Sequence, residues 1–344
     1  MEPLRVGLVG FGVMGGTHFQ NYKKLEENGV PVKLVAICDV DEAKLKATET
    51  AAGNAVTAAA QKMDLSAYGL YTCMADMIAK ENLDYVDLCL PTFLHAPMAI
   101  QAMEAGVHVF CEKPMAISSK ACQDMIDAAK KTGKIMMIGH TLRYWPAYEF
   151  LKEIKEDGRF GKPICAYFYR GGTTPIWSWE NWLLCKDRAG GALLDQHIHD
   201  VDTINWIFGM PAHVSSIGKN RFEGSGYDAV STNYIYEDFA FNAQDDWTIN
   251  GKGYGFEHSY RVSFEKGAVT FKGGKTTAHP DEGETYEPEA THDAYYKELV
   301  VFQDLIRNPQ AFDYMALLES HRDTIRLAEA EIRSCDKNGE KVAV

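Results

Sequence analysis

An aspartate and a histidine four residues apart form the most reactive pair of side chains in the sequence. Asp195 and His199 lie in the segment 190–202, whose apolar residues recur at helical spacing. On one helix, side chains four residues apart share a face and lie within interaction distance. An imidazole can take a proton from an alcohol near neutral pH, and a neighbouring carboxylate would orient it and favour its protonated form. The pair therefore predicts general-base chemistry on a hydroxyl group.

A second histidine in this segment, His197, raises the alternative of a metal site. Residues two apart on a helix face different directions, so His197 and His199 would be poor joint ligands. His199 with Asp195 alone would supply fewer ligands than a metal ion requires. We therefore expect no metal.

A lysine stands where an open parallel sheet would bind its ligand. Glu112, Lys113 and Pro114 come directly after the apolar segment 107–111. Ligands of such sheets bind beyond the carboxyl ends of the strands, so Lys113 is predicted to face a cofactor crevice. Its ammonium group can stabilise the negative charge that develops on an alcohol oxygen as hydride leaves. The alternative is a solvated lysine at the end of a strand.

A glycine-rich turn follows the first apolar segment. It consists of Gly10, Phe11, Gly12, Val13, Met14 and Gly15. In a dinucleotide fold the first glycine permits a tight turn, the second lets the backbone approach a pyrophosphate, and the third lets the helix pack closely. The helix that follows would present its N-terminal N–H groups to the phosphates.

Asp39 ends the next apolar segment and predicts which nucleotide is bound. A carboxylate at this position accepts both ribose hydroxyls of NAD and repels the 2′-phosphate of NADP. Val40 and Asp41 follow it, and no arginine or lysine stands beside it in the sequence. NAD is the expected cofactor, and NADP is less favoured.

Further candidates stand after other predicted strands. Thr92 in the turn Pro91–His95 is expected near the ribose or nicotinamide, whereas His95 could be only a first-turn helix residue. Arg143 and Tyr144 follow the last strand of the first domain and are candidate substrate contacts. Trp179 and its neighbouring tryptophans could stack on a sugar, but large aromatic side chains also fill cores and subunit contacts.

The elements that position these residues alternate between strand and helix in residues 1–142. Short apolar strands are predicted at 4–9, 32–39, 85–90, 107–111 and 135–139. Helices are predicted at 41–52, 73–80, 95–105 and 118–132. Residues 54–69 are expected to contain an extra helix, with a short strand near 70–72. This alternation predicts an α/β Rossmann domain with a doubly wound parallel sheet.

Residues 143–344 have a different pattern and predict an α+β domain for substrate binding and oligomerisation. Alternating, aromatic-rich strands are expected at 163–169, 214–219, 230–236, 240–250, 259–265 and 268–271. Helices are expected at 147–157, 191–208, 294–308 and 315–336. The result would be a large, mainly antiparallel open sheet, and association through that sheet is plausible.

Composition excludes several classes of partner. The chain has 344 residues and a net charge of −13, which disfavours nucleic acid and anionic membranes. The start of the sequence has no signal-peptide pattern, and no apolar run approaches membrane-spanning length. The 8 cysteines are scattered without a C-x-x-C pair. We expect a cytoplasmic protein with reduced thiols.

Four motifs in order resemble the Gfo/Idh/MocA oxidoreductases. They are the glycine-rich turn, the Pro91–His95 turn, Glu112-Lys113-Pro114, and the Gly190–Asp202 segment with its Asp195-x-x-x-His199 spacing. The resemblance covers essentially the whole chain. It implies NAD(P)-linked oxidation of a secondary hydroxyl on a sugar, a cyclitol such as inositol, or a related polyol. It also implies a catalytic triad of Lys113, Asp195 and His199, with His199 the proton acceptor, and a homodimer or homotetramer.

The resemblance leaves other functions open. Some family members act as glycosidases or epimerase-like enzymes through transient oxidation with tightly held NAD. Others are regulators that lack the triad, and the intact triad here argues against a catalytically silent nucleotide or sugar sensor. One departure from the usual family pattern is the stretch Gln196-His197-Ile198 between Asp195 and His199, which is expected to add a polar residue near the pocket or an interface.

Overall fold

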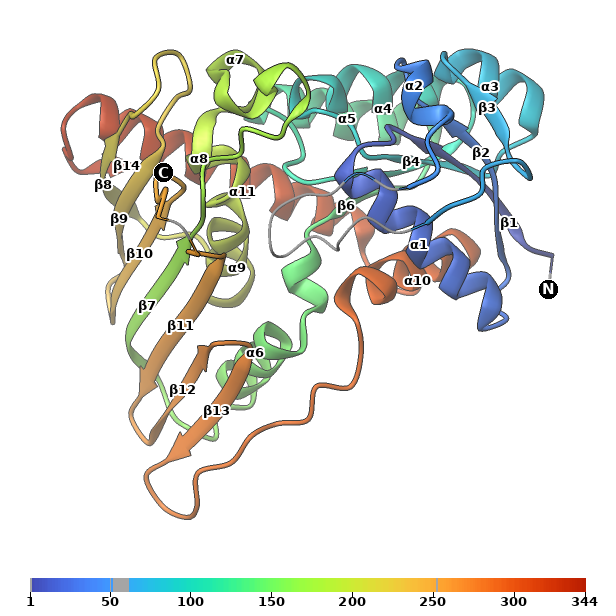
Figure 1. Ribbon diagram of the computed structural model, residues 1–344. Helices are drawn as coiled ribbons and strands as arrows, with labels where there is room; N and C mark the ends of the chain where they lie inside the picture. Colours follow the sequence, from blue (N-terminus) through green and yellow to red (C-terminus); the bar gives the residue numbers. More distant parts are fainter. Residues whose placement is uncertain (1, 50, 52–61, 252) are drawn as a thin grey trace. The chain divides into compact units, whose positions relative to one another are not determined.

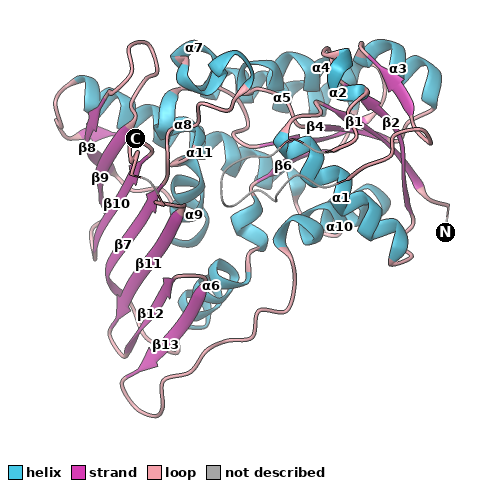
Figure 2. Cartoon of the chain, viewed as in Figure 1, coloured by secondary structure: helices cyan, strands magenta, loops and turns pink. Residues whose placement is uncertain are grey.

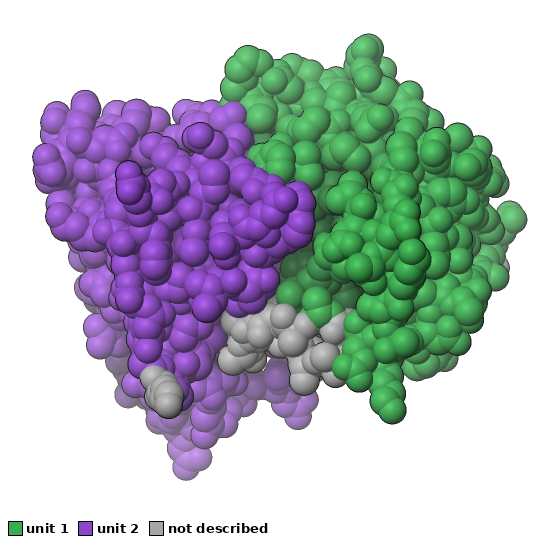
Figure 3. Space-filling model, turned by 45° about the horizontal axis from the view of Figure 1, so that its top comes forward, with its two compact units in different colours: residues 1–116, 120–139, 295–322 green, residues 117–119, 140–294, 323–344 purple. Residues whose placement is uncertain are grey.

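The chain folds into two compact units, coloured separately in Figure 3. The computed structural model describes residues 2–49, 51, 62–251 and 253–344. The first unit consists of Met1–Ala116, Lys120–Gly139 and Tyr295–Arg322. The second consists of Ile117–Ser119, His140–Ala294 and Asp323–Val344.

The first unit contains the predicted doubly wound parallel sheet. Its strands are β1 (Leu4–Val9), β2 (Val32–Cys38), β3 (Gly69–Tyr71), β4 (Tyr85–Leu88), β5 (His108–Glu112) and β6 (Met136–Gly139). They are hydrogen-bonded in the order β3-β2-β1-β4-β5-β6, with every pair parallel. The strand order reverses between β1 and β4, which is where such folds bind their ligands. The Rossmann prediction is therefore confirmed.

Helices cover both faces of this sheet. They are α1 (Val13–Glu27), α2 (Glu42–Leu45), α3 (Met74–Glu81), α4 (His95–Glu104), α5 (Ser119–Thr132) and α10 (Ala294–Arg307), with a short 3₁₀ segment η1 (Thr92–Leu94). The 3₁₀ segment η2 (Thr141–Tyr144) belongs to the second unit. Figure 1 shows α1 and α10 against one face and α3, α4 and α5 against the other. The helix predicted at 41–52 is wrong beyond Leu45, because Glu49 forms a β-bridge with Lys62 instead. Of the range 54–69, in which an extra helix was predicted, residues 54–61 lie outside the described residues, and 62–69 form a β-bridge, turns and the start of β3 rather than a helix.

The late helix α10 completes the core of the first unit. The ring of Phe302 packs edge-on against Tyr85 at 5.2 Å and contacts Phe110 at 5.5 Å. All three side chains are fully buried. The sequence-based boundary after residue 142 assigned this helix to the second domain, because chain order alone does not show that its apolar face returns to the first sheet.

The second unit contains an eight-stranded sheet. Its strands are β7 (Pro163–Gly171), β8 (His213–Lys219), β9 (Ala229–Ile235), β10 (Ala240–Asp246), β11 (Glu257–Phe264), β12 (Gly267–Lys272), β13 (Lys275–Pro280) and β14 (Val342–Ala343). Their order is β13-β12-β11-β7-β10-β9-β8-β14. Only the β7–β10 pair is parallel among these strands. The α+β prediction is confirmed, although β13 and β14 were not predicted.

Helices cover one face of this sheet, as Figure 2 shows. They are α6 (Pro146–Asp157), α7 (Lys186–Ala189), α8 (Gly191–Asp195), α9 (Ile198–Phe208) and the end of α11 (Tyr314–Asp336), with a 3₁₀ segment η3 (Trp179–Leu184). Tyr148 of α6 packs on Tyr260 and Phe271 of the sheet. The strands alternate buried and half-exposed residues, as expected for a sheet with one covered face.

The helix predicted at 191–208 is broken, which corrects the sequence analysis. α8 ends at Asp195 and α9 begins at Ile198. The backbone N–H groups of Gln196 and His197 both donate to the carbonyl oxygen of Ala192, at 2.9 and 2.8 Å. Because of this widened turn, Asp195 and His199 lie on two separate helices, α8 and α9, and not on one face of a single helix as predicted.

In the described parts of the chain, no helix is both long enough and apolar enough to cross a membrane.

Candidate functional site

The glycine-rich turn has the geometry that a dinucleotide requires. Gly10 has a φ of +89°, and a Cβ there would lie 2.3 Å from the carbonyl oxygen of Cys89. A Cβ on Gly15 would lie 2.0 Å from the carbonyl oxygen of Gly10, so helix α1 packs at a distance that only glycine allows. A Cβ on Gly12 would meet nothing within 4 Å. The open space therefore lies at the glycine that must admit a pyrophosphate, and the residues fit an NAD site.

The other residues of the turn begin α1 and support it. The Phe11 ring is buried against Phe19 at 5.7 Å. Val13 and Met14 form the first turn of α1 and are half-buried. Their backbone N–H groups lie at the helix N-terminus, where anions are favoured.

Asp39 lies at the end of β2 and is held by three donors. Its Oδ2 accepts the backbone N–H of Phe11 at 2.7 Å, and its Oδ1 accepts the backbone N–H of Asp41 at 2.9 Å. The Nζ of Lys44 donates to Oδ2 at 3.0 Å. This contact corrects the expectation that no cation lies beside Asp39, because α2 turns the chain back and places Lys44 there.

Lys113 directly follows the carboxyl end of β5 and is half-buried. Its backbone N–H donates to Oε2 of Glu112 at 3.0 Å. The next residue is also held: the imidazole of His95 lies 2.7 Å from the carbonyl oxygen of Pro114 and 2.8 Å from that of Leu90. His95 is fully buried, burial lowers its pKa, and its two ring contacts connect the β4 and β5 ends.

The adjoining turn from Pro91 to Leu94 is also partly enclosed. Pro91 is half-buried, and Thr92 is 1% exposed at the start of η1. These positions place the turn at the carboxyl end of β4, as the sequence predicted, while a direct contact of Thr92 with a cofactor stays a prediction.

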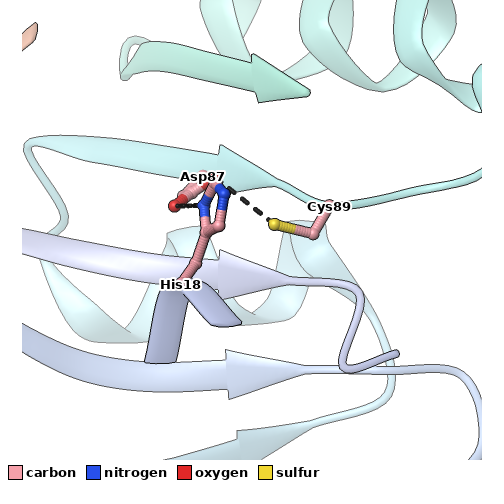
Figure 4. Close-up of side chains that lie close together, drawn as sticks. All are labelled: His18, Asp87 and Cys89. Carbon is pink, nitrogen blue, oxygen red and sulfur yellow. Dashed lines mark hydrogen bonds and ion pairs between the residues drawn. The ribbon is translucent and has the colours of Figure 1, made fainter. Parts of the chain in front are cut away.

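A buried histidine behind this edge was missed by sequence reasoning. His18 of α1 lies 2.7 Å from Oδ2 of Asp87 through Nδ1, and Cys89 lies beside the pair (Figure 4). Its Nε2 lies 3.0 Å from Oε1 of Glu112. The spacing of His18 to the glycine turn was a usable signal, since it is one helical turn beyond Gly15 and faces the sheet.

In the second unit, Asp195, Gln196 and His199 are half-buried. His197 and Asp200, between and after them, are 0% and 1% exposed. Asp195 and His199 are the pair predicted to do chemistry, and their roles stay predictions.

His197 belongs to a buried polar network, which corrects its expected place near a pocket or an interface. Its Nε2 lies 3.1 Å from the hydroxyl of Tyr234 and 3.2 Å from Oε2 of Glu331. Burial lowers the pKa of His197, but the Glu331 carboxylate outweighs it and the net pKa is raised. The network anchors the α8–α9 break to β9 and α11.

Two carboxylates adjoin His197. Asp200 accepts hydrogen bonds from Nε and Nη2 of the Arg170 guanidinium, at 3.1 and 2.9 Å. Burial raises the pKa of Asp245 to about 8. One ligand atom from each of His197, Asp200 and Asp245 lies within 4.8 Å of the others. Arg170 places a positive charge beside Asp200, and the raised pKa of Asp245 favours its neutral form.

The candidate substrate residues differ in accessibility. Arg143 is 6% exposed, and its guanidinium pairs with both oxygens of Asp202 at 2.8 and 2.7 Å. Tyr144 is half-buried in η2. Trp179 is 43% exposed with the Arg188 guanidinium 5.1 Å from its ring centre. Of the three, the structure leaves Trp179 the most accessible and commits Arg143 to an internal ion pair.

A glycine-rich turn on a doubly wound sheet, an acidic β2 end and a lysine after β5 define a nucleotide-dependent oxidoreductase. Two family models match the chain. The first is described as an oxidoreductase family with an NAD-binding Rossmann fold and matches residues 4–140. The second is described as the Gfo/Idh/MocA C-terminal domain and matches residues 148–270. The chain belongs to the Gfo/Idh/MocA oxidoreductase family, whose Rossmann domain binds NAD.

Relatives of known name span several activities. An inositol 2-dehydrogenase from Salmonella typhimurium is 30% identical over 207 residues, which cover 59% of this chain and 54% of the relative. A 2,7-anhydro-N-acetylneuraminate hydratase from Mediterraneibacter gnavus is 29% identical over 205 residues, which cover 58% of this chain and 54% of the relative. The matched region thus spans about half the length of these curated relatives.

Solved structures match over the whole chain. A levoglucosan dehydrogenase in complex with NADH and levoglucosan has a TM-score of 0.79 at 18% identity, covering 100% of both chains. The WlbA dehydrogenase from Bordetella pertussis, in complex with NADH and UDP-GlcNAcA, has a TM-score of 0.78 at 23% identity, covering 100% of this chain and 99% of the other. These similarities establish the fold.

Proposed function

We propose that this protein is an NAD-dependent dehydrogenase that oxidises a secondary hydroxyl group of a sugar, an inositol-like cyclitol or a related polyol. The observation that carries the proposal is that Asp195 and His199 are half-buried beside the fully buried His197 and Asp200, in a chain that also has Lys113 beyond β5. The names of two similar proteins, inositol 2-dehydrogenase and levoglucosan dehydrogenase, specify substrates of this class.

NAD would be held by the glycine-rich turn and Asp39. The space at Gly12 admits the pyrophosphate, and the Asp39 carboxylate accepts the ribose hydroxyls. Thr92 and the Glu112–Lys113 turn would line the nicotinamide end. When bound, the nicotinamide ring supplies the hydride acceptor.

The protein side chains would manage the proton and the charge on oxygen. His199 takes the proton of the substrate hydroxyl, and Asp195 stabilises the imidazolium that results. Lys113 donates to the same oxygen and stabilises its negative charge as the C–H bond breaks. Trp179 and Tyr144 are the proposed sugar-facing side chains, because an aromatic face packs against sugar C–H groups.

A second function is favoured by the hydratase relative. A hydratase makes no net oxidation, so a family member with that activity would use NAD transiently and regenerate it. In this chain the same three side chains would then serve a glycosidase- or epimerase-type reaction. The two functions differ in whether NADH accumulates in solution.

The experiment measures NADH absorbance with NAD, and then NADPH absorbance with NADP, against inositols, aldoses, anhydrosugars and sugar acids. Accumulation of NADH with one substrate supports the dehydrogenase. Product formation without NADH, with NAD recovered from the denatured protein, supports the transient-oxidation function. No product and no retained nucleotide contradicts both.

A substitution tests the role of His199. His199→Ala is expected to lower kcat by about 10²- to 10⁴-fold, the usual contribution of a general base, and to leave the Kd for NAD nearly unchanged. The matched control is His279→Ala, which removes a half-buried imidazole from β13 of the same unit. An equal loss of NAD affinity, or an equal loss of turnover in the control, would contradict the assigned role.

We also propose that the uncovered face of the eight-stranded sheet mediates homodimer or homotetramer formation. That face presents half-buried Tyr167 and Tyr169 of β7. Sedimentation equilibrium of the full chain tests this, and a monomer at all concentrations would refute it.

A further inference from the structure

His18 is enclosed between two carboxylates that belong to different strands. The side chains of His18 and Asp87 are 0% exposed and that of Glu112 is 7% exposed. Asp87 of β4 faces Nδ1 at 2.7 Å, and Glu112 of β5 faces Nε2 at 3.0 Å. A neutral imidazole has one N–H group and can donate to only one carboxylate. Two short contacts on opposite ring nitrogens are satisfied together only by an imidazolium.

The electrostatic surroundings agree with that geometry. Burial lowers the pKa of His18, but the Asp87 carboxylate and Cys89 outweigh it, so the pKa is well above its ordinary value. A Glu298 oxygen also lies within 4.8 Å of the ligand atoms of His18 and Glu112. The groups around the ring are therefore acidic, and they favour the positive form.

Glu112 connects this buried ring to the lysine turn. One carboxylate oxygen, Oε1, faces His18, and the other, Oε2, accepts the backbone N–H of Lys113 at 3.0 Å. A continuous series of contacts thus runs from Asp87 through His18 and Glu112 to the Lys113 backbone. It joins helix α1, which begins at the glycine-rich turn, to the end of β5.

A metal ion is the competing explanation for a cluster of His18, Asp87 and Cys89. Both nitrogens of His18 already face carboxylates, which leaves neither directed at a shared ion. Burial raises the pKa of the Cys89 thiol far above its usual range, and Cys89 Sγ donates to Oδ1 of Asp87 at 3.6 Å. A metal ligand would have to be a thiolate. The geometry is that of a hydrogen-bonded network.

We propose that His18 is a positioning residue for Lys113: its imidazolium fixes the Glu112 carboxylate, which in turn fixes the backbone from which the lysine side chain extends. The inference rests on the proposed role of Lys113 in catalysis. Loss of the ring's second N–H would free one of the two carboxylates and let the Lys113 turn move. Nucleotide binding would change little, because the glycine turn and Asp39 are held by other contacts.

The test compares three variants of the full chain. His18→Gln removes the bridge between the two carboxylates. Glu112→Gln keeps the shape of the side chain but removes its charge. This variant tests the same link if His18→Gln fails to fold. The control is Tyr22→Phe, on the same helix, which removes a 2.8 Å hydrogen bond to Asp87 and a 3.2 Å hydrogen bond from Tyr85 but leaves the contacts toward Glu112 in place.

The first measurement needs neither substrate nor cofactor. Hydrogen exchange of the Lys113 amide is expected to accelerate roughly tenfold or more in His18→Gln and Glu112→Gln, in line with the loss of a charge-assisted hydrogen bond, and to be unchanged in Tyr22→Phe. Nitrogen-15 NMR of the wild-type protein should show His18 protonated on both nitrogens above the ordinary imidazole pKa. A singly protonated ring, or equal acceleration in Tyr22→Phe, would overturn the proposal.

The second measurement separates positioning from general stability. With a substrate identified, kcat should fall about 10- to 100-fold in the two link variants, the usual size of an effect transmitted through a supporting residue, while the KM for NAD in His18→Gln stays within a few-fold. Unchanged kcat in both would overturn the inference. If the wild-type protein oxidises no polyol, the proposed function fails, and amide exchange still decides whether His18 positions the turn.

Discussion

Replacing Asp245 by asparagine is expected to remove a loss of stability that the protein suffers as the pH rises. Asp245 is 2% exposed, and within the described chain its Oδ2 has no hydrogen-bond partner. Burial raises the pKa of this carboxyl from 3.8 to about 8, against the opposing effect of His197. Asparagine is neutral and similar in shape, so it imitates the protonated side chain at every pH.

The sign and size follow from proton binding. Between the two pKa values the folded protein holds a proton that the unfolded chain has released, so the free energy of unfolding falls as the pH rises from about 4 to about 8 and is level above. One pKa unit corresponds to about 1.4 kcal/mol, so the difference between 3.8 and about 8 sets an upper limit of about 6 kcal/mol. Because His197 shares its charge with the same cluster, we expect about 2 to 4 kcal/mol.

The assay is urea unfolding of the wild-type protein and Asp245→Asn at several pH values from about 5 to about 9. The variant should gain stability over wild type steadily up to about pH 8, where the gain becomes constant. Asp246→Asn is the matched control, since it makes the same charge change at the next, half-buried residue of β10. A stability difference between wild type and Asp245→Asn that is independent of pH would refute the reasoning.

Three further predictions concern the turn, the cofactor and the second unit. Gly12→Ala should unfold at the wild-type temperature but bind NAD at least about tenfold more weakly in calorimetry. Gly15→Ala should lose about 1–3 kcal/mol of stability, because its Cβ would lie 2.0 Å from a carbonyl oxygen. Equal stability of the two variants would contradict this prediction. Asp39→Ser should raise the NADP-to-NAD ratio of kcat/KM, since Lys44, now 3.0 Å from the carboxylate, remains to pair with a 2′-phosphate; an unchanged ratio would count against it. Asp228→Ala should cost about 3 kcal/mol in thermal unfolding, because this buried carboxylate accepts an indole N–H at 2.8 Å and two backbone N–H groups; a loss under about 0.5 kcal/mol would be inconsistent with that network.

The first unit could be predicted closely because its signals are local. Apolar strands such as Leu4–Val9 and Val32–Cys38 have the bounds that hydrophobic runs indicate. The glycine spacing also specifies a backbone geometry directly, since a Cβ at Gly15 would collide with the turn.

What was missed depends on local turns and on strand order, which hydrophobic periodicity does not reveal. Lys44 reaches Asp39 because the chain turns after β2 into α2, which brings a side chain five residues onward back to the carboxylate. The break after Asp195 arises from a five-residue hydrogen bond to Ala192 that no helical periodicity reveals. The His18 cluster joins residues up to 94 positions apart, and their pairing is decided by strand order rather than by spacing.

The return of α10 to the first unit has a consequence for how the protein is made. Phe302 packs on Tyr85 and Phe110, and this unit also takes in Tyr295–Arg322. A nascent chain emerges from the ribosome N-terminus first, and domains usually fold as they are completed. Here the strands of the first sheet are synthesised long before the helix that covers Tyr85. The nucleotide-binding unit therefore completes its core only near the end of synthesis, after nearly all of the second unit has emerged, and a fragment that stops at Gly139 would lack the ring that covers Tyr85 and Phe110.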